Sequence, residues 1–300
     1  MKILALLLSL LIFTGCASKA ENNSIQTPPE SITLYRMQKG EIITISFKEY
    51  ITGCLFGEMS PSADIEALKA AACVIAGNTL YTLHSGRKYL GADVTDDVTQ
   101  YISLSEAEAQ YAGSYTHYLD KLSEAADFGI KHQLTFDGEL IYAPYCAIST
   151  GITDDGGVSW LPSVEVPADK DHTEACSNAA FTAEQVRRIM TELTGIRALG
   201  ADCTKWFSDA EYTKGGRLLH ISFGGARITG AQLKEAFGLR SEAISVEYSE
   251  ARFVFRVRGI GGNTGMSLNG AAQMASDGMT AEQILALFYP YTKLVECNQK

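Results

Sequence analysis

The sequence predicts an α+β fold with mixed short helices and antiparallel hairpins. Ser/Thr-x-x-Glu/Gln patterns indicate helix starts at Ser105, Thr182, Thr229 and Thr280. Asp137-Gly138, between two apolar stretches, is typical of a hairpin turn. The chain lacks the regular strand–helix alternation of a parallel α/β sheet.

The first elements follow from apolar spacing. Short alternating apolar stretches from Ile32 to Ser46 predict two strands. Apolar residues at helical spacing predict a helix from Phe47 to Phe56, which should end by Pro61. A second helix is expected from Ser62 to Leu83. Its many small residues allow close packing on several sides, so this helix should be central.

The later elements alternate between helix and strand. The helix that starts at Ser105 should reach about Ala126, and strands are expected at Gln133–Phe136 and Glu139–Ala143. Gly238 is well placed to end the helix that opens at Thr229. Further strands are expected at Leu218–Phe223 and Ala243–Val257.

The amino terminus has the features of an export signal. Ile3–Phe13 is almost entirely apolar but shorter than the ~20 residues of a membrane-spanning helix. Residues 13–16, ending at Cys16, resemble a bacterial lipoprotein signal, in which the thiol is lipidated. An ordinary signal peptide or an uncleaved anchor is the alternative. We therefore expect a signal at 1–16, a flexible tether at 17–31, and an exported domain at 32–297 on the outer face of the cytoplasmic membrane.

Charge argues against nucleic-acid binding. The chain has 25 basic and 35 acidic residues, a formal net charge of −10, and no run of Lys and Arg. A protein that binds DNA or RNA needs clustered positive charge. The sequence therefore predicts no nucleic-acid partner.

Several short motifs, found in order along the chain, carry a family resemblance. Tyr50–Met59, followed by Glu66–Ala72, resembles the opening signature of the stage II sporulation protein D family, cell-wall proteins that include the amidase-enhancer group. The resemblance spans roughly residues 32–294. The remaining matches follow in chain order: Asp93–Asp97, Leu134–Tyr145, Ser149–Thr153, Gly265–Ala271 and Gln283–Pro290.

The resemblance implies a lytic transglycosylase that cleaves peptidoglycan glycan strands, preferring strands stripped of peptides. It also implies two lobes around a glycan-binding groove, and it suggests no organic cofactor. The family's catalytic glutamate corresponds to Glu58. One acid suffices, because it protonates the leaving glycosidic oxygen and then accepts a proton from the sugar's own 6-hydroxyl. The alternative is that Glu58 is an ordinary surface carboxylate at a helix end.

The same resemblance suggests how a glycan is held. Tyr145 is expected at the groove, and hydroxyl contacts are expected from Ser149, Thr150, Thr153 and Ser267. Gly151 and Gly265 would let the backbone approach the sugar.

Several family positions are substituted. The family's Gln and Arg in the second helix are Ala71 and Ala76, a His is Cys146, and the closing motif has Gly262 and Leu268 in place of His and Gln. These losses suggest weakened catalysis. Glycan cleavage stays the first interpretation, and the alternative is a catalytically weakened glycan-binding protein or an accessory protein that enhances a cell-wall amidase or hydrolase.

Metal and disulfide chemistry stay open. Some family members hold zinc, and Cys146, His172 and Cys176 are weak candidates here, with a Cys146–Cys176 disulfide or free thiols as alternatives. Asp93, Asp96 and Asp97 could bind a cation, but a solvated loop or one that caps backbone amides is the default expectation.

Overall fold

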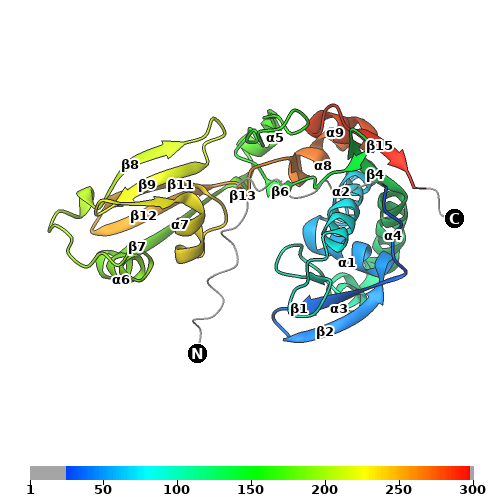
Figure 1. Cartoon of the computed structure of the whole chain (residues 1–300), viewed down its shortest axis with the longest axis horizontal. Coiled ribbons are helices and arrows are strands. Elements are labelled where there is room, and N and C mark those ends of the chain that lie inside the picture. Colours follow the sequence, from blue (N-terminus) through cyan, green and yellow to red (C-terminus); the bar gives the residue numbers. More distant parts are fainter. Residues whose placement is uncertain (1–24, 298–300) are drawn as a thin grey trace.

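The computed structural model describes residues 25–297 and confirms an α+β fold with several small sheets. The described chain has two hydrophobic cores, which lie at the right and left of Figure 1. The first core uses two parts of the chain, 32–166 and 266–289, and the second core uses the intervening segment, 186–257. A glycan-binding groove between two lobes stays a prediction.

Helices dominate the first core, and α2 is central to it, as expected. Every residue of α2 from Ala67 to Leu80 except Lys69 is buried, and α2 packs against the other long helices of this core. Gly129 lets α4 approach closely, because a Cβ there would lie 2.4 Å from the carbonyl carbon of Ala72. The helices of this part are α1 (Phe47–Glu58), α2 (Ile65–His84), α3 (Leu104–Tyr111), α4 (Tyr115–Lys131), α5 (Pro167–Lys170), α8 (Leu268–Ser276) and α9 (Ala281–Phe288).

Three small sheets border these helices. The strand orders are β2-β1-β3, β15-β4-β5 and β13-β6-β14. The third sheet, with β6, lies between the two cores in Figure 1. The strands are β1 (Ser31–Arg36), β2 (Glu41–Ser46), β3 (Val94–Thr95), β4 (His132–Phe136), β5 (Glu139–Leu140), β6 (Tyr145–Ile148), β13 (Ile260–Gly261), β14 (Met266–Ser267) and β15 (Lys293–Glu296).

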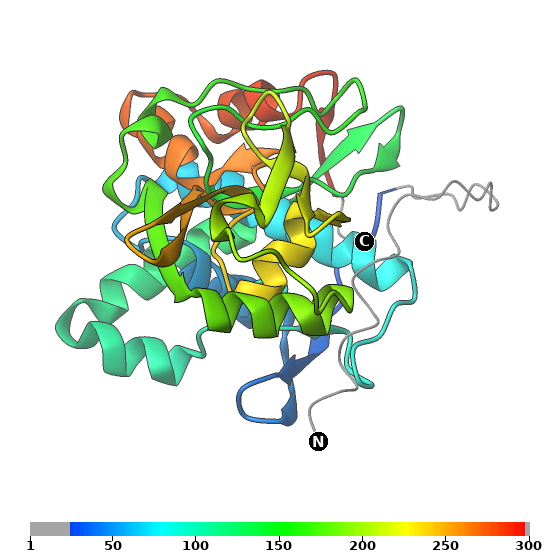
Figure 2. The same cartoon turned by 90° about the vertical axis from the view of Figure 1, so that its left-hand side faces the viewer.

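Two three-stranded antiparallel sheets and two helices form the second core. Figure 2, viewed from this side, shows α6 and α7 next to each other. The strand orders are β10-β9-β8 and β11-β12-β7. The elements are β7 (Cys176–Thr182), α6 (Ala183–Thr194), β8 (Phe207–Tyr212), β9 (Leu218–Phe223), β10 (Ala226–Thr229), α7 (Gly230–Phe237), β11 (Ala243–Ser249) and β12 (Arg252–Arg258).

The predicted capping boxes at Thr182, Thr229 and Thr280 are confirmed, and Gly238 ends α7 with φ 62°. The box expected at Ser105 is wrong. Ser103 caps α3, and its box partner is Glu106, which also forms an ion pair with Arg36. The expected single helix breaks at 112–114 and resumes as α4.

Two predicted strands also differ. Ala243–Val257 is a hairpin and not one strand, because Glu250 and Ala251 both take positive φ and reverse the chain. The strand predicted at Glu139–Ala143 is shorter, because β5 ends at Leu140.

No helix within residues 25–297 is both long enough and apolar enough to cross a bilayer. Cys16 and the predicted signal lie outside the described residues. Within the predicted tether, the backbone N–H of Gln26 donates to Oε1 of the buried Gln133 at 2.8 Å.

Candidate functional site

Glu58 is the last residue of α1. Ser46 starts this helix by accepting a hydrogen bond from the backbone N–H of Glu49, and the N–H of Met59 closes it on the carbonyl of Leu55. Most of α1 is buried in the first core, whereas Glu58 is half-buried. The helix therefore holds the carboxyl group at the edge of the core.

Two glycines bring a loop against the end of α1. A Cβ at Gly57 would lie 2.6 Å from the carbonyl oxygen of Gln100, and a Cβ at Gly53 would overlap Tyr101. The N–H of Ile102 donates to the carbonyl of Gly53 at 3.1 Å. In this close packing, the N–H of Gln100 donates to Oε1 of Glu58 at 2.6 Å.

The aspartates before this loop cap backbone amides. Asp93 accepts from the N–H and hydroxyl of Thr33, and Asp96 accepts from the N–H of Met37 at 2.8 Å. Asp97 is exposed. Within residues 25–297, no group of three or more His, Cys, Asp or Glu is arranged to hold a metal ion. The observed contacts therefore fit the capping alternative for this loop.

Tyr145 reaches the same point from another part of the chain. It begins β6, and its hydroxyl donates to Oγ1 of Thr99 at 3.3 Å and lies near enough to Glu58 to lower the pKa of that carboxyl group. Asn78 of α2 fixes the approach to β6, because its amide makes two 2.7 Å hydrogen bonds to the backbone of Ala143. The structure therefore brings the two predicted residues Glu58 and Tyr145 together.

Burial raises the pKa of Glu58 above its ordinary value, and this effect outweighs the hydrogen bonds from Gln100 and Tyr145, which lower it. The sequence could not give the sign of this shift. Burial is also the main cause of the raised pKa of Tyr145, and the neighbouring Glu58 adds to it. Burial raises the pKa of Cys54, one turn earlier in α1. The site thus favours neutral, hydrogen-bearing forms of all three groups.

Three of the predicted sugar contacts have internal roles instead. Ser149, Thr153 and Ser267 are fully buried. Ser267 caps α8 by accepting from the N–H of Gly270, and Thr153 accepts from the N–H of Val164 at 2.9 Å. The hydroxyl of Ser149 accepts from the N–H of Gly151 at 3.1 Å. Direct contact with a glycan is not available to these hydroxyls in this conformation, because each faces the protein interior.

Thr150, Gly151 and Gly265 also have structural contacts. Thr150 is half-buried and its hydroxyl donates to the carbonyl of Gly215 at 2.6 Å. Gly151 and Gly265 both have positive φ. A Cβ at Gly265 would lie 1.8 Å from the carbonyl oxygen of Pro144, so this glycine lets two backbone segments meet.

Four of the positions substituted relative to the family are interior ones, whereas Gly262 is exposed. Ala71, Ala76, Cys146 and Leu268 are all at most 3% exposed, so small or apolar side chains fit there. Cys146 is a buried free thiol, whereas Cys176 is an exposed one. The structure does not assemble a zinc site from Cys146, His172 and Cys176.

The sequence analysis missed the other members of the Glu58 site. Thr99 and Gln100 lie in a polar loop with no regular pattern. Asn78 had a detectable signal, because its polar amide follows the apolar stretch Ala70–Gly77 in the same helix.

Comparison with known proteins shows a family likeness. Residues 35–130 match the family model described as Stage II sporulation protein. The predicted resemblance is therefore confirmed. The family match includes Glu58 and Gln100, while Tyr145 lies beyond it.

Two curated proteins extend the likeness over nearly the whole chain. Stage II sporulation protein D of Bacillus subtilis (strain 168) is 27% identical to this chain over an alignment of 301 positions. The alignment covers 96% of this chain and 85% of that protein. Stage II sporulation protein D of Bacillus amyloliquefaciens is 24% identical over an alignment of 294 positions, which covers 94% of this chain and 83% of that protein.

Proposed function

We propose that this is a cell-wall protein related to sporulation that cleaves peptidoglycan glycan strands, with Glu58 as the single acid and base. The observation that supports this most is the Glu58 carboxyl itself. It is half-buried, has a raised pKa, and accepts a hydrogen bond from the N–H of Gln100, while the hydroxyl of Tyr145 lies near enough to lower its pKa. A carboxylic acid that keeps its proton toward neutral pH can donate it to a leaving oxygen.

The neighbours of Glu58 suit the two halves of that reaction. After Glu58 protonates the glycosidic oxygen, the carboxylate is stabilised by the hydrogen bond that is already in place from Gln100, and the hydroxyl of Tyr145 can turn from Thr99 to donate a second one. It can then take the proton of the sugar's 6-hydroxyl as that oxygen closes on the anomeric carbon. The product is a chain end with an internal anhydro ring.

The single-acid route needs only one carboxyl group at the site. The family resemblance assigns that role to Glu58 alone. Glycosidases that use water or a covalent intermediate need two carboxyl groups. A substrate that supplies its own nucleophile needs one.

The second candidate is a glycan-binding or amidase-enhancing accessory protein of the same fold. The substitutions at Ala71, Ala76, Cys146 and Leu268 favour it, because none of these side chains can replace the hydrogen bonds of Gln, Arg or His. In this alternative, a cell-wall amidase or hydrolase is the partner.

We also propose export with lipid attachment at Cys16, which would hold the domain at the outer face of the cytoplasmic membrane next to its glycan substrate. Residues 13–16 support this proposal. Mass spectrometry of the membrane fraction should find the diacylglyceryl group on Cys16, and a Cys16→Ser variant should lose it.

The test of the proposed activity uses purified glycan strands stripped of peptides. The wild-type protein should release fragments with anhydro ends, detected by mass spectrometry, and Glu58→Gln should reduce the rate by at least about 100-fold. Glu108→Gln is a matched control, because Glu108 is exposed on α3, and it should cleave normally. Equal cleavage by wild type and Glu58→Gln would exclude this role of Glu58. No cleavage by wild type, with stimulation of an added amidase, would favour the accessory function.

A further inference from the structure

The outer face of the β11-β12-β7 sheet carries arginines. Along β12, Phe253, Phe255 and Val257 are buried in the second core, together with residues of α6 and α7. Because side chains alternate along a strand, Arg256 and Arg258 lie on the opposite face, where both are exposed.

The strands on either side leave these arginines uncovered. Arg256 is paired with Ser245 on β11 and with Asn178 on β7. Arg258 is paired with Ala243 and Cys176. These neighbours are short, so a ligand can reach the guanidinium groups from above the sheet.

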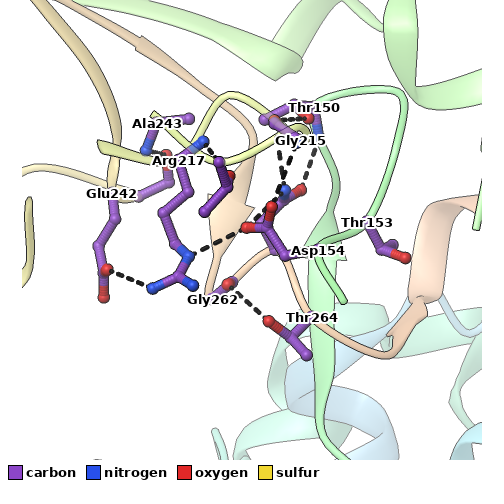
Figure 3. A network of polar contacts seen from close by, with 12 residues as sticks. Thr150, Thr153, Asp154, Gly215, Arg217, Glu242, Ala243, Gly262 and Thr264 are labelled. Atoms are coloured by element: carbon purple, nitrogen blue, oxygen red, sulfur yellow. Dashed lines mark hydrogen bonds and ion pairs between the residues drawn. The ribbon is translucent and has the colours of Figure 1, made fainter. Parts of the chain in front are cut away.

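The turn between β8 and β9 closes one side and forms a pocket of about 620 Å³. Tyr212, Lys214 and Gly215 line it from that side. The turn is held by the network in Figure 3, in which the N–H of Gly215 donates to Asp154 at 3.2 Å. Pockets of this size commonly hold small molecules.

The pocket is basic although the chain is acidic. Arg256, Arg258 and Lys214 line it, and no Asp or Glu does, in a protein whose formal charge is −10. Arg256 is paired with Glu247 at 2.9 Å. Within the described part of the chain, neither Arg258 nor Lys214 forms an ion pair, so their charge is available to a ligand.

We propose that this pocket is a second binding site, and that it takes a sugar bearing a carboxylate. The planar guanidinium of Arg258 matches a carboxylate with two parallel hydrogen bonds. Asn178 and Ser245, which are paired with Arg256 on the same face, offer hydrogen bonds that a single anionic group would leave unused. The exposed ring of Tyr212 gives an apolar surface for a sugar face. The second core and its strands supply most of this site, Thr150 and Ile152 from the preceding segment complete it, and it does not depend on the role of Glu58.

Binding of two matched sugars tests the proposal. N-acetylmuramic acid and N-acetylglucosamine share a pyranose ring, but only the first has a carboxylate. Calorimetry with the full-length protein should detect N-acetylmuramic acid, with at least tenfold weaker binding of N-acetylglucosamine. Arg258→Met should weaken binding of the acid at least tenfold. Arg252→Met is the control, since it lies on the same strand and face but outside the pocket, and it should bind normally.

Three results of the binding test would overturn the proposal: equal binding of both sugars, no effect of Arg258→Met in a folded variant, or binding of inorganic phosphate without binding of N-acetylmuramic acid.

Cys176 supplies an independent measurement, because its exposed thiol lines the pocket. Anionic iodoacetate should alkylate Cys176 faster, relative to neutral iodoacetamide, in wild type than in Arg258→Met. N-acetylmuramic acid should slow both reactions. An unchanged rate ratio would contradict a basic pocket.

Discussion

The Glu58 carboxyl combines two opposing influences at the scale of one residue. Burial favours its protonated form, while the N–H of Gln100 and the hydroxyl of Tyr145 favour the carboxylate. An acid that must first give and then accept a proton benefits from both, because neither state is prohibitively stable.

The raised pKa also has a stability consequence. The pKa of Glu58 is higher in the folded protein than the value near 4.3 of an unfolded chain, so the folded state binds this proton more tightly. The contribution of this proton to folding stability is complete below the pKa that Glu58 has in the unfolded chain. It is lost as pH rises through the higher pKa that Glu58 has in the folded protein. Glu58→Gln should therefore raise the melting temperature relative to wild type at pH 7, and this gain should shrink toward pH 4.

The measurement is a series of thermal melts from pH 4 to pH 8. The exposed Glu108→Gln variant should show no pH-dependent difference from wild type. A Glu58→Gln variant that is less stable than wild type at pH 7, but not at pH 4, would show that the carboxylate is favoured in the folded state.

At the scale of elements, the site depends on contact between α1 and the loop that follows β3. Gly57 permits this contact, because a Cβ would meet the backbone of Gln100. Gly57→Ala should displace the loop, destabilise the protein by about 1–3 kcal/mol, and lower the rate of glycan cleavage. Urea denaturation and hydrogen exchange of the Gln100 amide report these effects.

Gly77→Ala in α2 is the matched control for that change. A Cβ at Gly77 meets no atom within 4 Å, and Ala is favoured in a helix by roughly 0.5–1 kcal/mol. It should leave cleavage unchanged and stability equal or higher. If Gly57→Ala behaved like Gly77→Ala, the close packing of the loop on α1 would not be needed.

The helices and strands also show which structural features could be predicted from the sequence. Capping boxes at Thr182, Thr229 and Thr280 gave correct helix starts, because their chemistry is local. The strand β7 was missed, since its alternating exposed residues are small and polar. Ser149, Thr153 and Ser267 were chosen as sugar contacts because hydroxyls suit sugars, but their burial depends on packing between distant segments. The approach of Tyr145 to Glu58 likewise depends on the fold, because the sequence placed Tyr145 only at the groove, next to the Ser149–Gly151 segment.

At the scale of the whole molecule, a polar network joins the inserted second core to the segments around it. Asp154 accepts hydrogen bonds from Arg217 at 3.0 Å and from Asn263 at 3.3 Å, as Figure 3 shows for Arg217. Asp154 is 3% exposed, and Arg217 also pairs with Glu242. Breaking a buried pair leaves its remaining partners without compensation.

Asp154→Ala should therefore destabilise the protein by about 3 kcal/mol and uncouple the two cores. The two tryptophans provide separate probes, since Trp160 packs against the first core and Trp206 is buried in the second. Two variants are compared, one keeping only Trp160 and the other keeping only Trp206. When Asp154 is present, the urea unfolding transitions of these two variants should coincide. When Asp154→Ala is added to both, the two transitions should occur at different urea concentrations. Arg227→Met removes an exposed ion pair and should change stability by less than about 1 kcal/mol. Coincident transitions in Asp154→Ala would show that this network does not couple the cores.

The most direct test of the central claim is a titration of the Glu58 carboxyl by carbon-13 NMR, with the resonance assigned by its loss in Glu58→Gln. The account predicts a pKa above the ordinary value of a glutamate, and a still higher one in Tyr145→Phe, because that change removes a nearby hydroxyl that lowers the pKa of Glu58. A wild-type pKa at or below the ordinary value would contradict the claim that Glu58 is held ready as an acid.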